Sequence, residues 1–179
     1  MNASTIENPA RRRLGLALAG YGALQPLARA GSGAAATRPV SFEAFGVDSW
    51  VRLRAELARP AIVVFTATWC PHCPGVITAL AAASRARGAR LAIVVVDGAA
   101  REELPAALPY RLADRLFFFE GNETALRHGV DARWRGVLPY VALLGADGSG
   151  PVFIAGMPSD EALGGWAARH SSPSSSGSS

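Results

Sequence analysis

Two cysteines, Cys70 and Cys73, directly follow a continuous apolar run, and this junction restricts the possible folds more than any other feature of the sequence. Residues 61–65 are apolar and rich in β-branched side chains, which is typical of a strand buried on both faces. Helical spacing of apolar side chains begins at Cys73 and ends at Gly88. Because residues 91–96 form a second apolar run, the segment predicts a strand–helix–strand unit with parallel strands.

The segments on either side of this unit complete an α/β order. Helices are expected over 48–57, 101–113 (in short pieces broken at Pro105 and Pro109), 122–129 and 158–166, and strands over 140–144 and 152–155; residues 116–119 fit either a short strand or a buried aromatic turn. An Asp-Gly pair at 147–148 favours an antiparallel hairpin. The sequence therefore predicts a central mixed sheet flanked by helices, with a helical insertion in the middle.

The position of the two cysteines predicts different roles for them. The first turn of a helix presents unpaired N–H groups and the positive end of the helix dipole. A thiolate at Cys70 is expected to be stabilised there, so Cys70 is the predicted nucleophile. Cys73 lies one turn further in and is predicted to form or resolve the disulfide.

The two residues between the cysteines are expected to tune this chemistry. Pro71 fits the first helical turn, where its missing N–H leaves no hydrogen bond unmade. His72, if cationic or donating a hydrogen bond, favours the Cys70 thiolate further. Stabilising the reduced form makes the disulfide a stronger oxidant, so we expect a more oxidising pair than one with Gly-Pro at these positions.

Two other uses of the cysteines stay open from the residues alone. The bridge could be purely structural, although so short a loop restrains the unfolded chain little. The cysteines and His72 could also bind a soft metal, copper more readily than zinc. Tetrahedral zinc needs further ligands, and His128 and His170 stand alone in the sequence. We predict no resident metal, and no organic cofactor, because the chain has no Gly-rich phosphate loop.

The two ends of the chain differ from the part between them. Residues 1–30 combine a basic stretch at 11–13, an apolar run and a small-residue triplet at 28–30, the layout of a secretory signal peptide. An uncleaved membrane-anchoring helix is the alternative. Residues 31–39 are then a flexible lead, residues 40–170 the folded domain, and residues 171–179 a disordered tail of Ser, Gly and Pro.

The net charge of +4 does not indicate a nucleic-acid partner. Four of the eighteen arginines and one of the fourteen acidic residues lie in the predicted signal peptide, and the chain has no lysine. The remainder carries fourteen arginines against thirteen acidic residues, which is too balanced for a phosphate-binding surface.

With these residues in view, the chain resembles the thioredoxin-like superfamily, in particular the TlpA-type periplasmic thiol:disulfide oxidoreductases of bacteria. The matching segments are Phe-Thr-Ala-Thr-Trp-Cys-Pro-His-Cys at 65–73, Trp-Arg-Gly-Val-Leu-Pro-Tyr at 134–140 and the Asp-Gly turn at 147–148. The resemblance covers about residues 40–169. It implies an α/β thioredoxin-like fold and a periplasmic location, or a membrane-anchored one if the signal peptide is not cleaved.

The resemblance also implies roles for residues outside the cysteine pair. Pro139 should be a cis proline that faces the disulfide and leaves the backbone of Leu138 to pair with an extended substrate; a trans proline on an edge strand is the alternative. Trp69 should flank the sulfurs as part of an apolar docking surface, or else pack in the core. Many family members have a buried acidic residue under the cysteines, and residues 61–65 contain none.

The predicted activity is dithiol–disulfide exchange on exported proteins that bear thiols or disulfides. A membrane redox partner would reset the cysteine pair. Pro-His between the cysteines resembles the oxidising branch of the superfamily, whereas the overall layout resembles TlpA-type reductases, so both directions of electron flow stay open. A periplasmic copper-binding module that uses the same cysteines is the alternative function.

Overall fold

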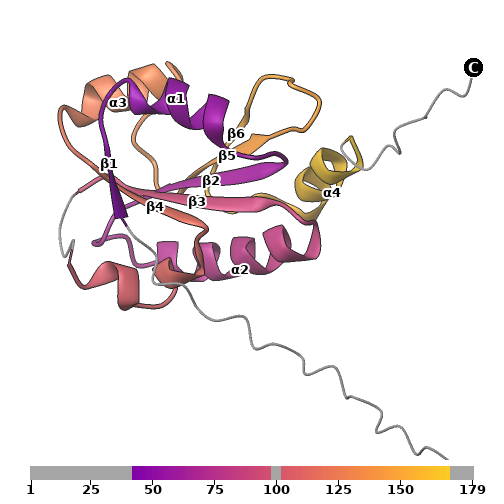
Figure 1. The fold of residues 1–179 in the computed structure, drawn as a ribbon, viewed down its shortest axis with the longest axis horizontal. Coiled ribbons are helices and arrows are strands. Elements are labelled where there is room, and N and C mark those ends of the chain that lie inside the picture. Colours follow the sequence, from indigo (N-terminus) through magenta and orange to yellow (C-terminus); the bar gives the residue numbers. More distant parts are fainter. Residues whose placement is uncertain (1–41, 98–101, 170–179) are drawn as a thin grey trace, which may run out of the picture. The chain divides into compact units, whose positions relative to one another are not determined.

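A mixed β-sheet forms the centre of the part of the chain that the structure, a computed structural model, describes: residues 42–97 and 102–169. Its strands are β1 (Phe42–Phe45), β2 (Ala61–Thr66), β3 (Arg90–Val95), β4 (Arg115–Phe119), β5 (Tyr140–Leu144) and β6 (Val152–Ala155). They lie in the order β1-β4-β3-β2-β5-β6. The first four are mutually parallel, β5 pairs antiparallel with β2, and β6 antiparallel with β5 (Figure 1).

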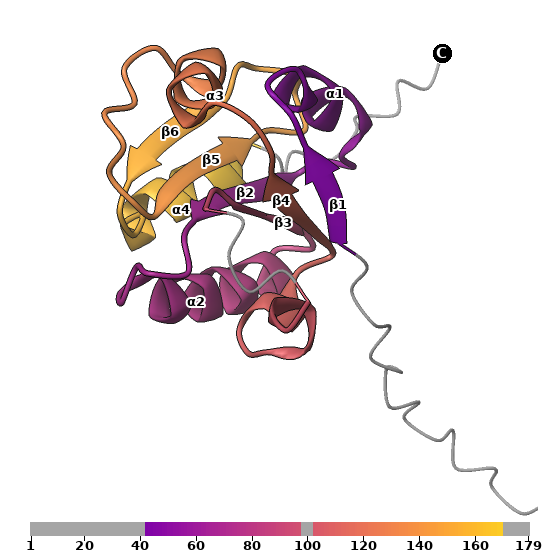
Figure 2. The same ribbon diagram turned by 90° about the vertical axis from the view of Figure 1, so that its left-hand side faces the viewer.

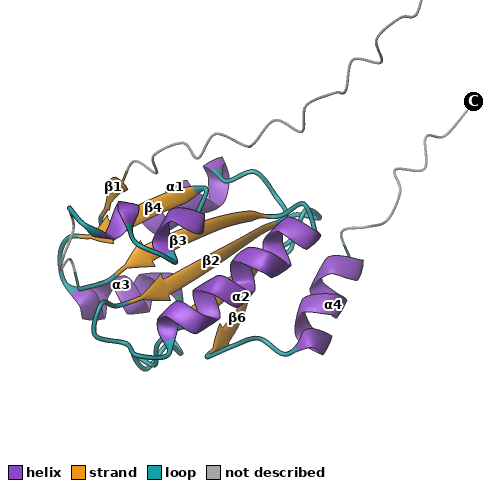
Figure 3. Cartoon of the chain, turned by 90° about the horizontal axis from the view of Figure 1, so that it is seen from below, coloured by secondary structure: helices purple, strands orange, loops and turns teal. Residues whose placement is uncertain are grey.

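Helices cover both faces of this sheet (Figure 2). They are α1 (Ser49–Glu56), α2 (Cys73–Ala86), α3 (Glu123–Val130) and α4 (Asp160–Ala168), with short 3-10 helices at Leu104–Ala106 and Tyr110–Leu112. Apolar side chains of α1 and α3 pack in one core cluster, and those of α2, α4 and both 3-10 helices pack in the other. The two core layers therefore lie on opposite faces of the sheet, with α2 and α4 on the same side (Figure 3).

The structure confirms the predicted α/β class, with a central mixed sheet, flanking helices and an insertion in the middle. The predicted signal peptide (1–30), lead (31–39), tail (171–179) and His170 lie outside the described residues. Among the described residues, no helix is long and apolar enough to cross a membrane.

The insertion contributes a strand as well as short helices. Residues Leu116, Phe117, Phe118 and Phe119 are all buried in β4. Leu116 and Phe118 join the core on the α2 side, whereas the other two join the core on the α1 side. This alternation resolves the open choice at 116–119 in favour of a strand, and it inserts β4 between β1 and β3.

Three local predictions need correction. The edge strand β1 was not predicted, because its four residues are too few to show a clear pattern and only Phe45 is buried. Helix α3 continues past Gly129 to Val130, whose side chain is buried in the core. Helix α2 begins at Cys73, so Pro71 precedes the first helical turn and Pro74 occupies it.

Candidate active site

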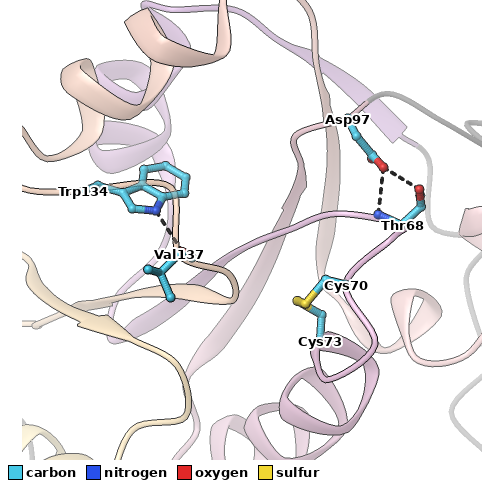
Figure 4. Close-up of a disulfide and its surroundings, with 6 residues drawn as sticks. All are labelled: Thr68, Cys70, Cys73, Asp97, Trp134 and Val137. Carbon is cyan, nitrogen blue, oxygen red and sulfur yellow. Dashed lines mark hydrogen bonds between the residues drawn. A yellow bond between two sulfur atoms is a disulfide. The ribbon is translucent and has the colours of Figure 1, made fainter.

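The two cysteines form a disulfide where β2 leads into α2 (Figure 4). Their Cα atoms are 5.5 Å apart. Cys70 lies in a tight turn, in which its N–H donates to the carbonyl of Ala67 at 3.2 Å. Cys73 is the first residue of α2, and its N–H donates to the carbonyl of Cys70 at 3.3 Å. The pair therefore lies at the amino-terminal end of a fourteen-residue helix, as predicted.

Exposure distinguishes the two cysteines in the predicted order, but the outer one is well covered. Cys70 is 5% exposed and Cys73 is 0% exposed, and neither belongs to the two core clusters. The residues around them are open, since Trp69 is 67% exposed and Pro71 and His72 are also exposed. Of the two cysteines, only Cys70 therefore has exposed surface that a reaction partner can reach.

His72 occupies the N-cap position of α2 without using its side chain as a cap. Its carbonyl accepts a hydrogen bond from the N–H of Val76 at 3.3 Å, and its imidazole stays exposed. No side chain therefore takes up the free N–H groups of the first turn through a capping bond at this position. This leaves the positive end of the helix directed at the cysteine turn.

Asp97 was not among the predicted site residues. It follows β3 and forms hydrogen bonds with Thr68, two residues before Cys70. Its Oδ2 accepts hydrogen bonds from the backbone N–H of Thr68 at 2.9 Å and from the Thr68 hydroxyl. Its Oδ1 is buried without a hydrogen-bond partner among the described residues. The parallel pairing of β2 with β3 places the residues just after β2 beside those just after β3. Spacing along the sequence does not indicate that Asp97 and Thr68 meet.

A buried tyrosine, Tyr110, lies near the same strand ends. The pKa of Tyr110 lies above its ordinary value, chiefly because the side chain is buried. The charge of Asp97 acts in the same direction, and the hydroxyl of Thr66 opposes it. Thr66 and Asp97 therefore lie close enough to the Tyr110 hydroxyl to influence its pKa. The strand residues 61–65 contain no acid, and Asp97 is an acidic residue outside that strand.

The loop before β5 lies at the same edge of the sheet as the cysteine turn. Phe65 of β2 pairs with Tyr140 of β5, so residues just after β2 and just before β5 are neighbours. The Leu138–Pro139 peptide bond is cis. Leu138 is half-buried, and its backbone N–H and C=O have no hydrogen-bond partner among residues 42–97 and 102–169. Pro139 is buried, and its carbonyl accepts from the N–H of Gly156 at 2.8 Å.

A hydrogen-bonded and stacked group fixes this loop. The hydroxyl of Tyr140 donates to Oδ2 of Asp131 at 2.7 Å, and the indole of Trp134 stacks on the Tyr140 ring with centroids 4.6 Å apart. The indole N–H of Trp134 donates to the carbonyl of Val137 at 2.9 Å (Figure 4). These contacts hold both ends of the segment that contains Leu138.

The charges in this group shift the pKa of two of its members. Burial raises the pKa of Tyr140 to about 12, with the hydrogen bond to Asp131 acting in the same direction. Burial also acts to raise the pKa of Asp131, but hydrogen bonds from the Arg133 backbone, the Tyr140 hydroxyl and the Arg133 side chain outweigh it and leave that pKa below its ordinary value.

The lowered pKa of Asp131 predicts a pH-dependent contribution to stability. A carboxyl whose pKa is lower in the folded state stabilises the fold above its unfolded pKa, about 3.9, and loses this effect as pH falls through the folded value. We expect Asp131→Asn to lower the free energy of unfolding by about 1 kcal/mol at pH 7. The difference from wild type should shrink as the pH is lowered below about 4.

Urea unfolding at pH 7 and at pH 3 measures both quantities. Asp48→Asn is the matched control, because Asp48 is exposed and its side chain makes no capping hydrogen bond to α1. A difference between Asp131→Asn and wild type that is equally large at both pH values would contradict the assigned role of the charge.

The described residues offer little for a multidentate metal site. They contain no group of three or more His, Cys, Asp or Glu side chains placed to hold a metal ion. A Cu(I) site would therefore depend on the two cysteines, with at most His72 beside them. The copper-binding alternative is not favoured by this arrangement.

Comparisons with known proteins give matches among solved structures only. No protein-family model and no curated protein matches the chain. A thio-disulfide isomerase from Thermus thermophilus is 23% identical, with 62% of this chain and 78% of that chain covered and a TM-score of 0.43. A secreted Mycobacterium tuberculosis disulfide oxidoreductase, described as homologous to E. coli DsbE, is 18% identical, with 64% and 84% covered and a TM-score of 0.46. A thioredoxin-family thiol:disulfide interchange protein from Chlorobium tepidum is 17% identical, with 62% and 78% covered and a TM-score of 0.45.

The chain's own topology decides its fold. The cysteine pair follows a central parallel strand and opens α2, and the cis Leu138–Pro139 bond precedes the antiparallel strands β5 and β6. Helix α4 then closes the chain's described part. This is the order of elements that the resemblance implies, and the fold is thioredoxin-like.

Proposed function

We propose that this protein is a thiol:disulfide oxidoreductase that acts through Cys70 and Cys73. The observation that carries the proposal is the disulfide at the amino-terminal end of α2, with Cys70 on the outer side and Cys73 fully covered. A helix end of this kind stabilises a thiolate, and a thiolate is the attacking species in disulfide exchange.

In the reducing direction, the Cys70 thiolate attacks one sulfur of a substrate disulfide. A Cys70–substrate disulfide forms, and the other substrate sulfur leaves as a thiolate that takes up a proton. Cys73, after losing its proton, then attacks the Cys70 sulfur. The products are the Cys70–Cys73 disulfide and a substrate with two thiols, and oxidation of a substrate runs the same steps in reverse.

The remaining predicted site residues are proposed to support this exchange. Pro71 and His72 shape the cysteine turn, and the exposed Trp69 offers an apolar surface for docking. Pro139 is proposed to face the disulfide. The unpaired backbone groups of Leu138 are available, within the described part of the chain, for hydrogen bonds to an extended substrate segment.

We further propose that the protein acts outside the cytoplasm, in the periplasm, after export directed by residues 1–30. Its substrates would be exported proteins that bear thiols or disulfides, and a membrane redox protein would restore the active form of the cysteine pair. The support is the signal-like sequence of residues 1–30.

A trapping experiment tests the proposed activity. The reduced Cys73→Ala variant of the full chain is incubated with a peptide that contains a disulfide, and the product is analysed by mass spectrometry. We expect an adduct with one peptide per chain, bonded through Cys70 and released by dithiothreitol. Absence of the adduct, with tight stoichiometric Cu(I) binding by the wild type, would support the copper-binding alternative instead.

The residue between the cysteines should set the redox equilibrium. We expect His72→Gly to make the pair more reducing by about 30 mV, a change of about tenfold in the equilibrium constant, because the Cys70 thiolate loses a nearby donor. Equilibration with glutathione buffers measures the shift. Arg169→Ala is the control, since this exposed basic residue lies at the end of α4 and not in the cysteine turn. An unchanged equilibrium in His72→Gly would remove His72 from the proposed machinery.

A further inference from the structure

A basic surface pocket lies beside the loop that leads to Leu138. It has a volume of about 280 Å³. Its lining residues come from α3 and from the segment that follows it: Thr124, Arg127, His128, Ala132, Trp134 and Arg135. The lining therefore combines three basic side chains with an indole and contains no acidic residue.

Charge pairing around the pocket is incomplete. Arg127 lies 3.9 Å from Glu123, and neighbouring Arg133 is paired with Asp131 at 3.2 Å. Arg135, in contrast, has no ion pair or side-chain hydrogen bond within the part of the chain that the structure describes, and the same holds for the side chain of His128. The pocket therefore presents an uncompensated guanidinium to solvent.

A second lining arginine, Arg127, lies close to the backbone of the loop at Gly136. Gly136 has a φ of +87°, and a Cβ at this position would lie 2.1 Å from Nη1 of Arg127. Only glycine lets the guanidinium approach the backbone this closely. Arg127 also donates to the hydroxyl of Thr124 at 3.2 Å and lies 3.9 Å from Glu123, so its side chain has partners on its own helix.

The pocket is also connected to the proposed substrate-docking backbone. Trp134, which lines the pocket, is 5% exposed and donates its indole N–H to the carbonyl of Val137, the residue before Leu138. Arg135 precedes Leu138 by three residues, so their Cα atoms are at most about 11 Å apart. A segment docked along Leu138 therefore extends within reach of the Arg135 side chain.

We infer that this pocket binds a carboxylate side chain, Asp or Glu, on the cysteine-bearing segment of the partner protein. The inference rests on the proposed function, because it assigns the substrate a location at Leu138. Arg135 supplies the free guanidinium, whose planar N–H groups match a carboxylate, and Arg127 adds a second positive charge to the lining. An acidic residue about two to four positions from the substrate cysteine would lie opposite the pocket.

The test measures binding apart from chemistry. Peptides with serine in place of the reactive cysteine, and with either glutamate or glutamine about two to four residues away, are titrated into the oxidised full chain and followed by fluorescence anisotropy. We expect the glutamate peptide to bind about two- to fivefold more tightly, the range of an exposed charge pair. The preference should disappear in 1 M salt, where the screening length is only about 3 Å.

Two variants test whether the preference for the glutamate peptide comes from the pocket. Arg135→Ala should abolish it, whereas Arg169→Ala, which removes an equal charge at the end of α4, should retain it. Equal binding of both peptides by the wild type, or an undiminished preference in Arg135→Ala, would overturn the inference. Cysteine-containing versions of the peptides test exchange separately: loss of the preference with normal exchange refutes the pocket alone, and absence of exchange refutes the proposed function.

Discussion

Cys70→Ser is expected to reduce disulfide turnover by the full chain to the rate of the uncatalysed reaction. A serine hydroxyl is not ionised at neutral pH and forms no mixed disulfide, so the first step of exchange is lost. Cys73 cannot replace it efficiently, because this residue is 0% exposed. A cysteine without a stabilised thiolate is only a few per cent ionised at about pH 7. We therefore expect Cys73 in the Cys70→Ser variant to attack a disulfide at least about tenfold more slowly than Cys70 does in the wild type.

The matched variant Cys73→Ser is expected to fail at a later step. Its Cys70 attacks a chromogenic aromatic disulfide and releases about one equivalent of aromatic thiol, and the reaction then stops at the mixed disulfide. The reduced wild type releases about two equivalents, because Cys73 displaces the second. Stopped-flow absorbance measures both amounts and rates. A faster reaction of Cys70→Ser than of Cys73→Ser would reverse the assigned roles of the two cysteines.

The part of the site that is contiguous in sequence could be predicted from sequence. The apolar run before Cys70 and the helical spacing after Cys73 locate a strand, a turn and a helix, and these local patterns are enough to position the pair. The first helical turn was assigned to Pro71, whereas the structure gives it to Pro74. The difference of a few residues arises because both prolines suit the start of a helix.

The groups that surround the site depend on contacts between distant segments. Asp97 reaches Thr68 across twenty-nine positions of sequence, and only the parallel pairing of β2 with β3 makes them neighbours. Tyr140 and Asp131 are nine positions apart, at the two ends of a loop that has no periodic pattern to indicate that they meet. Such partners follow from the register of the sheet and the path of a loop, and neither is encoded in local spacing.

The insertion shows a different limit of sequence patterns. A half-buried strand alternates apolar and polar residues, but β4 is buried on both faces and its four consecutive apolar residues fit a strand or a turn equally well. The choice is made by its neighbours, because β4 pairs with β3 on one side and β1 on the other. The pairing of β4 with its neighbours, and not its local sequence pattern, therefore decides that these residues form a strand.

The largest effect on stability is expected from Phe65→Ala, in the strand that leads to the cysteine turn. Phe65 is 0% exposed in the central strand β2. Its ring lies 5.1 Å from that of Trp134 and 5.7 Å from that of Trp50, with both distances measured between centroids. Removing it leaves a cavity between helices α1 and α3 and the sheet. Buried phenylalanine-to-alanine changes cost about 3–5 kcal/mol, a large share of the about 5–15 kcal/mol that stabilises a typical domain.

Phe42→Ala is the matched control, because it makes the same chemical change on the edge strand β1, where Phe42 is 46% exposed. Its ring retains one edge-to-face contact, with Phe118 at 5.4 Å, so we expect a loss of about 1 kcal/mol. Urea unfolding followed by circular dichroism gives both values. Since Phe65 also contacts Trp134, the indole that donates to Val137, its removal should loosen the loop before β5 and slow exchange even where the variant stays folded. Equal losses of stability in the two variants would show that the core beneath the site contributes no more than the edge of the sheet.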